Sequence, residues 1–197
     1  MSSVAIITTG EPVAGVEERV RPLLRVEYDR LVELGCFQDD RIELLNGQLV
    51  EVMPQRAPHA GTVEQITAIL APLLSGRARL RIQAPFAATD DSEPEPDLAV
   101  VAPVEHVTEH PRTAFLVIEV ADTSLRRDLE RKPAIYAAAG VEDYWVVDLV
   151  NRVVVVHREP MSNRYCRITT HRGDEFVTVL AFSNLKVRVS DLLPRGL

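Results

Sequence analysis

Two carboxylates in the middle of the chain lie in or beside short apolar segments, and this setting points to chemistry. Asp97 comes directly before the apolar run 98–101, and Glu119 lies inside the otherwise apolar run 115–121. Such runs, of strand length, are typical of strands buried on both faces of a sheet. An ionised carboxylate there is unstable unless it has a cation, a metal ion or a proton as its partner. Glu119 is expected to have one of these partners, and Asp97, on a neighbouring strand, is expected to converge on the same ion.

The elements that must position these carboxylates follow from hydrophobic periodicity and turn residues. Asn46-Gly47 predicts a hairpin between strands at 41–45 and 48–53. Helices are expected over 25–37 and 58–74, the second kinked or cut short in its last turn by Pro72. A last helical turn is expected near Asp191. Further strands are expected at 79–83, 97–101, 114–121, 144–147, 152–157 and, as a late meander, at 165–170 and 176–180. This mixture predicts an α+β or α/β fold, with helices flanking a central mixed sheet.

A helical segment after the second carboxylate strand places a lysine on an apolar face. At 100° per residue, Lys132 shares one face with Leu125, Leu129, Tyr136 and Ala139. Either this lysine is directed into the protein, or its stem follows the surface while its ammonium stays in water. Pro133 would disturb the face if the helix proper begins near it.

In this order along the chain, the residues resemble the PD-(D/E)XK nuclease superfamily. The closer resemblance is to small bacterial proteins grouped as restriction endonucleases of unknown substrate. It rests on Pro96-Asp97, on the strand Ile118-Glu119-Val120, and on the downstream residues Asp128, Lys132 and Tyr136. The hairpin at 42–50 and the segment 139–148 are similar as well, so the resemblance runs from about residue 25 to the C-terminus. It implies a restriction-endonuclease-like fold.

The resemblance also implies a role for the matching residues. Asp97 and Glu119 would be catalytic ligands of Mg²⁺ (or Mn²⁺), with the carbonyl of Val120 or Ala121 as a further ligand. The family's usual lysine lies two residues after the second carboxylate, where this chain has Ala121. Lys132 is therefore expected to act as a migrated catalytic lysine.

Five further residues are candidates with a weaker basis. Glu43 could add a carboxylate from the hairpin, or be a solvated charge. His59 matches a histidine of the family, although a histidine at a helix start is more often a surface residue. Gln83 could position water, and Tyr136 belongs to the matching set. Asp128 is expected to be an ion-pair partner or a cap rather than a ligand.

Length and composition limit the possibilities. The 197 residues fit one domain, expected at 21–197 behind a flexible tail at 1–20. No apolar run approaches the ~20 residues that a membrane helix needs, and no secretory signal is expected at the N-terminus. Cys36 and Cys166 are isolated, as expected for reduced thiols in a cytoplasmic protein. The net charge of −7 argues against a broadly basic surface, but not against a local basic groove.

The expected function is Mg²⁺-dependent endonuclease activity on nucleic acid, DNA in the first place. Water would be the nucleophile, and Lys132 would orient it or neutralise developing charge. Ala121 and the acidic composition favour a second hypothesis, a non-catalytic nucleic-acid-binding or accessory module with the same fold. A third is a structural ion-pair cluster without metal. The resemblance also makes a homodimer one expected assembly, because related nucleases often dimerise.

Overall fold

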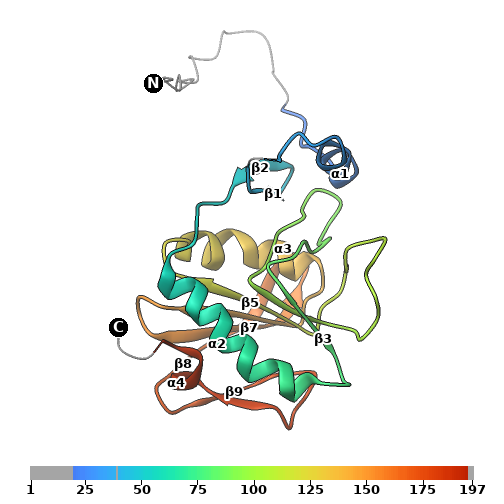
Figure 1. The fold of residues 1–197 in the computed structure, drawn as a ribbon. Coiled ribbons are helices and arrows are strands. Elements are labelled where there is room, and N and C mark those ends of the chain that lie inside the picture. The colour runs from blue at the N-terminus through green and yellow to red at the C-terminus, as the bar shows by residue number, and fades with distance from the viewer. Residues whose placement is uncertain (1–19, 39, 195–197) are drawn as a thin grey trace.

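A six-stranded sheet organises the part of the chain that the computed structural model describes, residues 20–38 and 40–194 (Figure 1). In spatial order, its strands are β3 (Arg79–Ile82), β4 (Leu98–Val101), β5 (Leu116–Ala121), β6 (Asp143–Asp148), β7 (Val153–Met161) and β8 (Arg164–Arg172). Strands β5 and β6 run parallel, and the other neighbouring pairs are antiparallel. The expected mixed sheet is confirmed, and the two carboxylate strands are neighbours within it.

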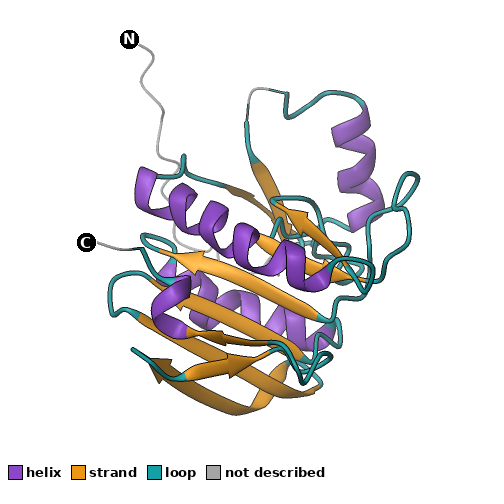
Figure 2. Ribbon diagram, turned by 60° about the horizontal axis from the view of Figure 1, so that its bottom comes forward, coloured by secondary structure: helices purple, strands orange, loops and turns teal. Residues whose placement is uncertain are grey.

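The two faces of the sheet carry separate apolar layers, and helices cover both of them (Figure 2). One layer is formed with α2 (Ala57–Leu74), α4 (Val189–Leu192) and the hairpin of β9 (Phe176–Thr178) and β10 (Lys186–Arg188). The other layer is formed with α3 (Lys132–Ala138).

Side chains alternate between these layers along β5. Ile118 and Val120 belong to the α2 layer, whereas Val117 and Ala121 belong to the α3 layer. Because successive residues of a strand point to opposite faces, Glu119 shares the α3 face. The strand therefore directs its one carboxylate toward the helix that begins with Lys132.

Helix α1 (Arg25–Glu33) and the hairpin of β1 (Ile42–Leu45) and β2 (Gln48–Glu51) lie above the sheet in Figure 1. The turn is the predicted Asn46-Gly47, with φ angles of 50° and 70°. Such positive angles at both central residues match the twist of the two strands. A Cβ on Gly47 would also lie 2.2 Å from Cβ of Pro22, so this position needs glycine for space as well as for conformation.

Helix α2 continues through Pro72 and ends at Leu74, so its last turn is not cut short, which was one of the two effects expected of this proline. Proline removes one backbone donor, and the carbonyl that loses its partner is that of Ala68. Ala68 is exposed, so water can replace the missing donor. The proline is therefore tolerated near the end of the helix.

Pro133 is accommodated in another way. Residues 125–138 are continuously helical, but Arg127–Arg131 form a π-helical turn, in which the Lys132 N–H donates to the carbonyl of Arg127, five residues back. A π turn relaxes the α-helical pattern just before a residue that has no N–H to donate. Lys132 and Tyr136 are both buried beside the sheet, as the predicted helical face requires.

The end of α1 and the pairing of the segment 176–180 differ from the sequence prediction. Helix α1 ends at Glu33, short of residue 37, because Gly35 adopts a φ of 75°, a conformation that terminates helices. The segment 176–180 does not extend the meander of β6, β7 and β8, since β9 pairs with β10 in a separate hairpin. The predicted tail lies outside the described residues except for Val20. None of the described helices is long and apolar enough to cross a membrane.

The α2 layer provides a direct test of the fold. Leu70 is 0% exposed, whereas Leu73 on the same helix is 45% exposed. We expect Leu70→Ala to lower the free energy of unfolding by about 2–5 kcal/mol, because it leaves a cavity, and Leu73→Ala to lower it by less than about 1 kcal/mol. Urea unfolding measures both values. Equal losses in the two variants would contradict this packing.

Candidate active site

Glu119 is the centre of a buried hydrogen-bonded cluster. It is 3% exposed, and its Oε1 accepts hydrogen bonds from Lys132 Nζ at 2.8 Å and from Tyr136 OH at 2.7 Å. Its Oε2 accepts none from the described residues, and the side chain lines a pocket. Burial raises the pKa of Glu119 to about 8, and the charge of Lys132 only partly opposes this. The sequence predicts a cation, a metal ion or a proton as the partner of Glu119, and the structure provides the cation Lys132.

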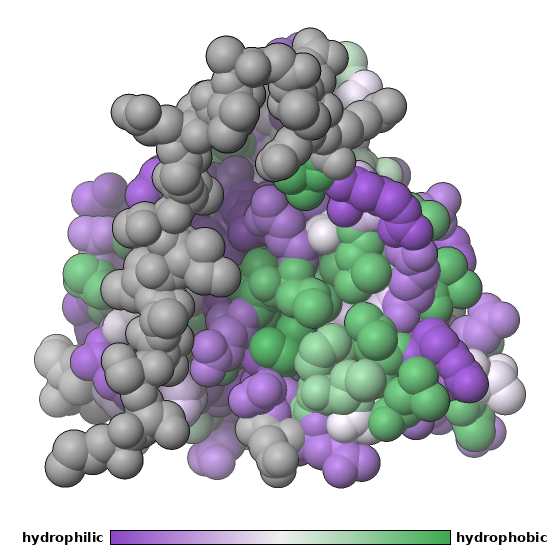
Figure 3. Space-filling view, turned by 90° about the horizontal axis from the view of Figure 1, so that it is seen from above, coloured by the Kyte–Doolittle hydropathy of each residue, from purple (hydrophilic) through white to green (hydrophobic). Residues whose placement is uncertain are grey.

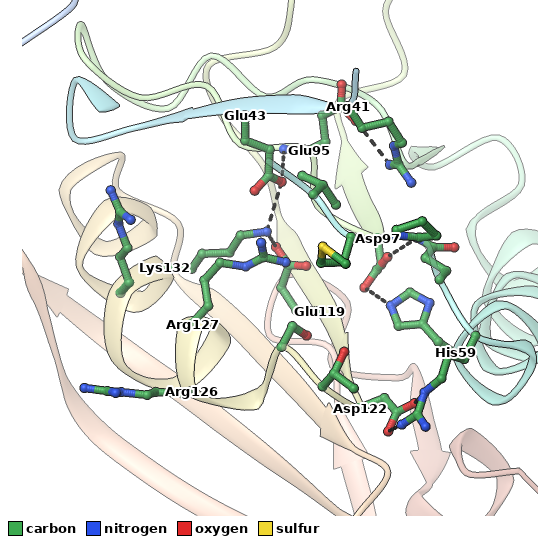
Figure 4. Close-up of a pocket in the computed structure, with 18 of the residues that line it drawn as sticks. Arg41, Glu43, His59, Glu95, Asp97, Glu119, Asp122, Arg126, Arg127 and Lys132 are labelled. Atoms are coloured by element: carbon green, nitrogen blue, oxygen red, sulfur yellow. Dashed lines mark hydrogen bonds and ion pairs between the residues drawn. The ribbon is translucent and has the colours of Figure 1, made fainter. Parts of the chain in front are cut away.

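Asp97 lies beside Glu119 because β4 and β5 pair antiparallel with Leu98 opposite Ile118. Its Oδ2 accepts hydrogen bonds from the backbone N–H of Val120 at 2.8 Å and from His59 Nε2 at 3.1 Å. Since a carboxylate only accepts, His59 carries its proton on Nε2 in this contact. Figure 4 shows Asp97 and Glu119 between Lys132 on one side and His59 on the other.

The second oxygen of Asp97 is held only weakly. The side-chain amides of Gln55 and Gln83 both lie 3.5 Å from Oδ1, which is long for a hydrogen bond. Gln83 therefore lies beside Asp97, and its role in placing water stays a prediction. Asp97 thus keeps Oδ1, and Glu119 keeps Oε2, for a further partner.

Lys132 joins the floor of the site to the hairpin above it. Its ammonium is 3.2 Å from Oε1 of Glu43 on β1 as well as 2.8 Å from Glu119, and the residue is 1% exposed. Burial lowers the pKa of Lys132, but Glu119, Glu43 and Asp128 outweigh it and raise the pKa above its ordinary value. Lys132 is therefore a buried cation, and a lysine with its ammonium in water is ruled out by this geometry.

Glu43 contributes to the same cluster from the hairpin. Its Oε1 also accepts a hydrogen bond from the backbone N–H of Glu95 at 2.9 Å, and its Oε2 is buried without a hydrogen-bond partner among the described residues. Because Glu43 is 1% exposed, it is not the solvated charge that one alternative assumed.

Tyr136 and Asp128 complete the cluster from the helical segment. Burial and Glu119 raise the pKa of Tyr136 well above 10, so its hydroxyl is a constant donor. Asp128 accepts a hydrogen bond from the hydroxyl of Ser124, and Tyr144 OH donates to its backbone carbonyl at 2.7 Å. Asp128 is thus held as a structural partner within its own helical segment, where burial raises its pKa despite Lys132.

The pocket at this cluster has a volume of about 540 Å³. Sequence reasoning did not single out Gln55, which lies in the connection between β2 and α2, where no periodicity marks a residue. The guanidinium of Arg131 donates to the carbonyl of Leu45 at 2.7 Å. Arg131 therefore fixes the hairpin instead of being free in solvent.

The donors present fit a hard divalent cation, although they do not form a closed cage. No group of three or more His, Cys, Asp or Glu side chains in the described part of the chain is arranged to hold a metal. Mg²⁺, however, is commonly held by one or two carboxylates plus waters. The two oxygens left by Asp97 and Glu119 match that requirement.

The raised pKa of Glu119 predicts a pH dependence of stability. Between the ordinary pKa of 4.5 and the folded-state value of about 8, the folded protein binds more protons than the unfolded chain. The free energy of unfolding should therefore fall as pH rises through this window. Glu119→Gln removes the titration, so its stability relative to wild type should rise with pH. Urea unfolding in EDTA measures this, with the exposed Glu159→Gln as the control that keeps the wild-type slope.

The buried cation predicts a second effect on stability. Lys132→Met leaves Glu43 and Glu119 buried without their cation, and we expect a loss of about 3–5 kcal/mol. Lys186→Met is the matched control, because Lys186 is the only other lysine of the chain and is exposed. Adding Glu43→Gln to Lys132→Met should recover part of the loss. Equal stability of the two single variants would refute the pairing.

Comparison with known proteins supports the fold. The chain is similar to a solved structure described as a "putative nuclease belonging to DUF820 from Anabaena variabilis ATCC 29413", with a TM-score of 0.69, 17% sequence identity, and coverage of 87% of this chain and 97% of that chain. This likeness shows the fold. No curated protein matches the chain. The family Uma2, described as "Putative restriction endonuclease", matches residues 26–190, and the chain belongs to this family.

Proposed function

We propose that this protein is a metal-dependent nuclease that hydrolyses phosphodiester bonds with water as the nucleophile. The observation that carries the proposal is the cluster of Asp97, Glu119 and Lys132, in which a lysine and two carboxylates meet at the floor of one pocket. The nuclease-like fold and the family support the reaction class. A buried set of opposite charges at a pocket floor is typical of sites built for catalysis.

Asp97, through Oδ1, and Glu119, through Oε2, would hold Mg²⁺ or Mn²⁺ together with the backbone carbonyl of Val120. The ion would supply charge stabilisation on the phosphate and a more acidic water. His59 and the N–H of Val120 hold Oδ2 of Asp97, so that Oδ1 is left for the ion. Lys132 and Tyr136 do the same for Glu119 by occupying Oε1. These donors orient the ligands in the manner of outer-shell partners at known metal sites.

Lys132 supplies the positive charge that Ala121 cannot. Ala121 is 0% exposed and packs in the α3 layer, on the same face of β5 as Glu119. A lysine at position 121 would reach Glu119 from the strand, whereas Lys132 reaches it from α3 at 2.8 Å. Because its pKa is raised, Lys132 stays protonated, so it would stabilise developing negative charge on the phosphate rather than accept a proton.

The proposal predicts the effect of metal on wild type and variants. Mn²⁺ or Mg²⁺ should raise the melting temperature of the wild type, because an ion that binds only the folded state stabilises it by mass action. Asp97→Asn and Glu119→Gln should abolish this shift and the metal-dependent cleavage of DNA, and Glu159→Gln should keep both. Lys132→Arg, which retains a charge, should bind metal but lose activity on the order of 10²-fold or more.

The same experiment distinguishes the nuclease from the alternative function. A metal shift and DNA binding without cleavage would establish a non-catalytic accessory module. If neither ion changes the melting temperature of the wild type, the metal site does not exist, and the cluster is a structural ion pair.

A further inference from the structure

The shape of the pocket restricts which substrates the proposed nuclease can take. The groups expected to meet the phosphate are almost inaccessible, since Glu119 is 3% exposed, Asp97 6% and Lys132 1%. They lie at the floor of the 540 Å³ pocket, and the β1–β2 hairpin crosses above them (Figure 4). A phosphate must enter this pocket to reach them.

The β1–β2 hairpin, which forms the roof of the pocket, is held in place by hydrogen bonds on both sides. Backbone hydrogen bonds join it to the segment before β4, with Glu93 N donating to Leu44 O and Gly47 N donating to Asp91 O, both at 2.7 Å. The backbone N–H of Asn46 donates to Ser92 Oγ at 2.9 Å. On its other side, Arg131 and Lys132 bond to the hairpin from the helical segment. Opening the roof would break all these bonds at once, so the pocket keeps its size.

A site of this size favours a single strand over a duplex. Its phosphates lie on the outside of a wide, stiff cylinder whose major groove alone is about 12 Å across. A volume of about 540 Å³ is instead typical of pockets that take small molecules. A single strand can bend its backbone and turn its bases outward, so that one or two nucleotides enter such a space.

The arginines around the pocket are arranged for few contacts with phosphates. Three of its arginines are already paired, Arg41 with Glu95, Arg56 with Asp122 and Arg126 with Glu130. Duplex-binding proteins usually neutralise many phosphates from a basic face. The net charge of −7 argues against a broadly basic surface of this kind.

The wall of the pocket also suits a base. The connection from β2 to α2 contributes Val52, Met53 and Pro54 to the lining, and Met53 is 69% exposed. A methionine thioether makes favourable contacts with aromatic rings. An apolar side chain this exposed, in a pocket otherwise lined mainly by charges, offers a surface for an unstacked base.

We propose that this pocket takes a single-stranded segment of nucleic acid, such as a free strand or a flap, and excludes the duplex. The proposal rests on the nuclease function. The scissile phosphate would lie over Asp97 and Glu119, and an adjacent base would pack against Met53.

Binding is tested without turnover. The Glu119→Gln protein in EDTA is titrated into a fluorescein-labelled DNA strand of about 12 nucleotides, and into the blunt duplex of the same sequence. Fluorescence anisotropy should show that the strand binds tighter on the order of tenfold or more. Adding Met53→Ala should weaken strand binding about fivefold or more, as expected from the loss of one base contact. Adding Met161→Ala should not, because Met161 on β7 is also exposed and does not line the pocket.

Cleavage by the wild type in Mn²⁺ is measured on the same two DNAs and on a duplex with a single-stranded flap. The strand and the flap should be cut, and the blunt duplex should remain intact. Equal binding or equal cutting of strand and blunt duplex overturns the single-strand proposal and leaves the nuclease function standing. Tight strand binding with no cleavage of any DNA overturns the nuclease function and supports the assigned ligand. Absence of strand binding overturns the assigned ligand.

Discussion

The site depends on a carboxylate in the interior of the sheet. Glu119 lies on a strand whose other residues are apolar and fully buried, so its charge must be matched within reach of its own side chain. The match is made by Lys132 and Tyr136 on one oxygen only. Burial still raises the pKa of the carboxyl to about 8, so a further positive charge at the second oxygen would be favourable. The charge of Glu119 is therefore only partly compensated. This affects both the stability of the fold and the tendency of the pocket to take up a further cation.

Lys132 also makes the roof and the floor of the pocket parts of one structure. Its ammonium joins Glu119 on the sheet to Glu43 on the hairpin, at 2.8 and 3.2 Å. A buried cation between two carboxylates contributes little net stability by itself, but its removal leaves two buried carboxylates without a counter-charge. The geometry of the pocket and the charge state of its floor are therefore coupled.

Much of this arrangement could be predicted from sequence because it rests on strong local signals. Asn46-Gly47 determines the hairpin, and Glu119 and Lys132 are each out of place on an apolar face. Because both side chains are expected to be buried and have opposite charges, each is the expected partner of the other. The contacts of Gln55 and Arg131 could not be predicted, because a polar residue in a connection or on a helix carries no periodic signal of what it meets. Strand β10 was missed because Lys-Val-Arg has a single apolar residue.

The π turn before Pro133 affects how this site would be found in other sequences. A π turn contains one more residue than an α turn, yet here it delivers Lys132 to the same face of the sheet as Glu119. A relative without the proline could use an ordinary turn and reach the same position with one residue fewer. The separation of the glutamate and the lysine along the chain is then free to differ between relatives. A search with a fixed-length motif would overlook such proteins, whereas a search for a lysine that meets the buried glutamate in space would recover them.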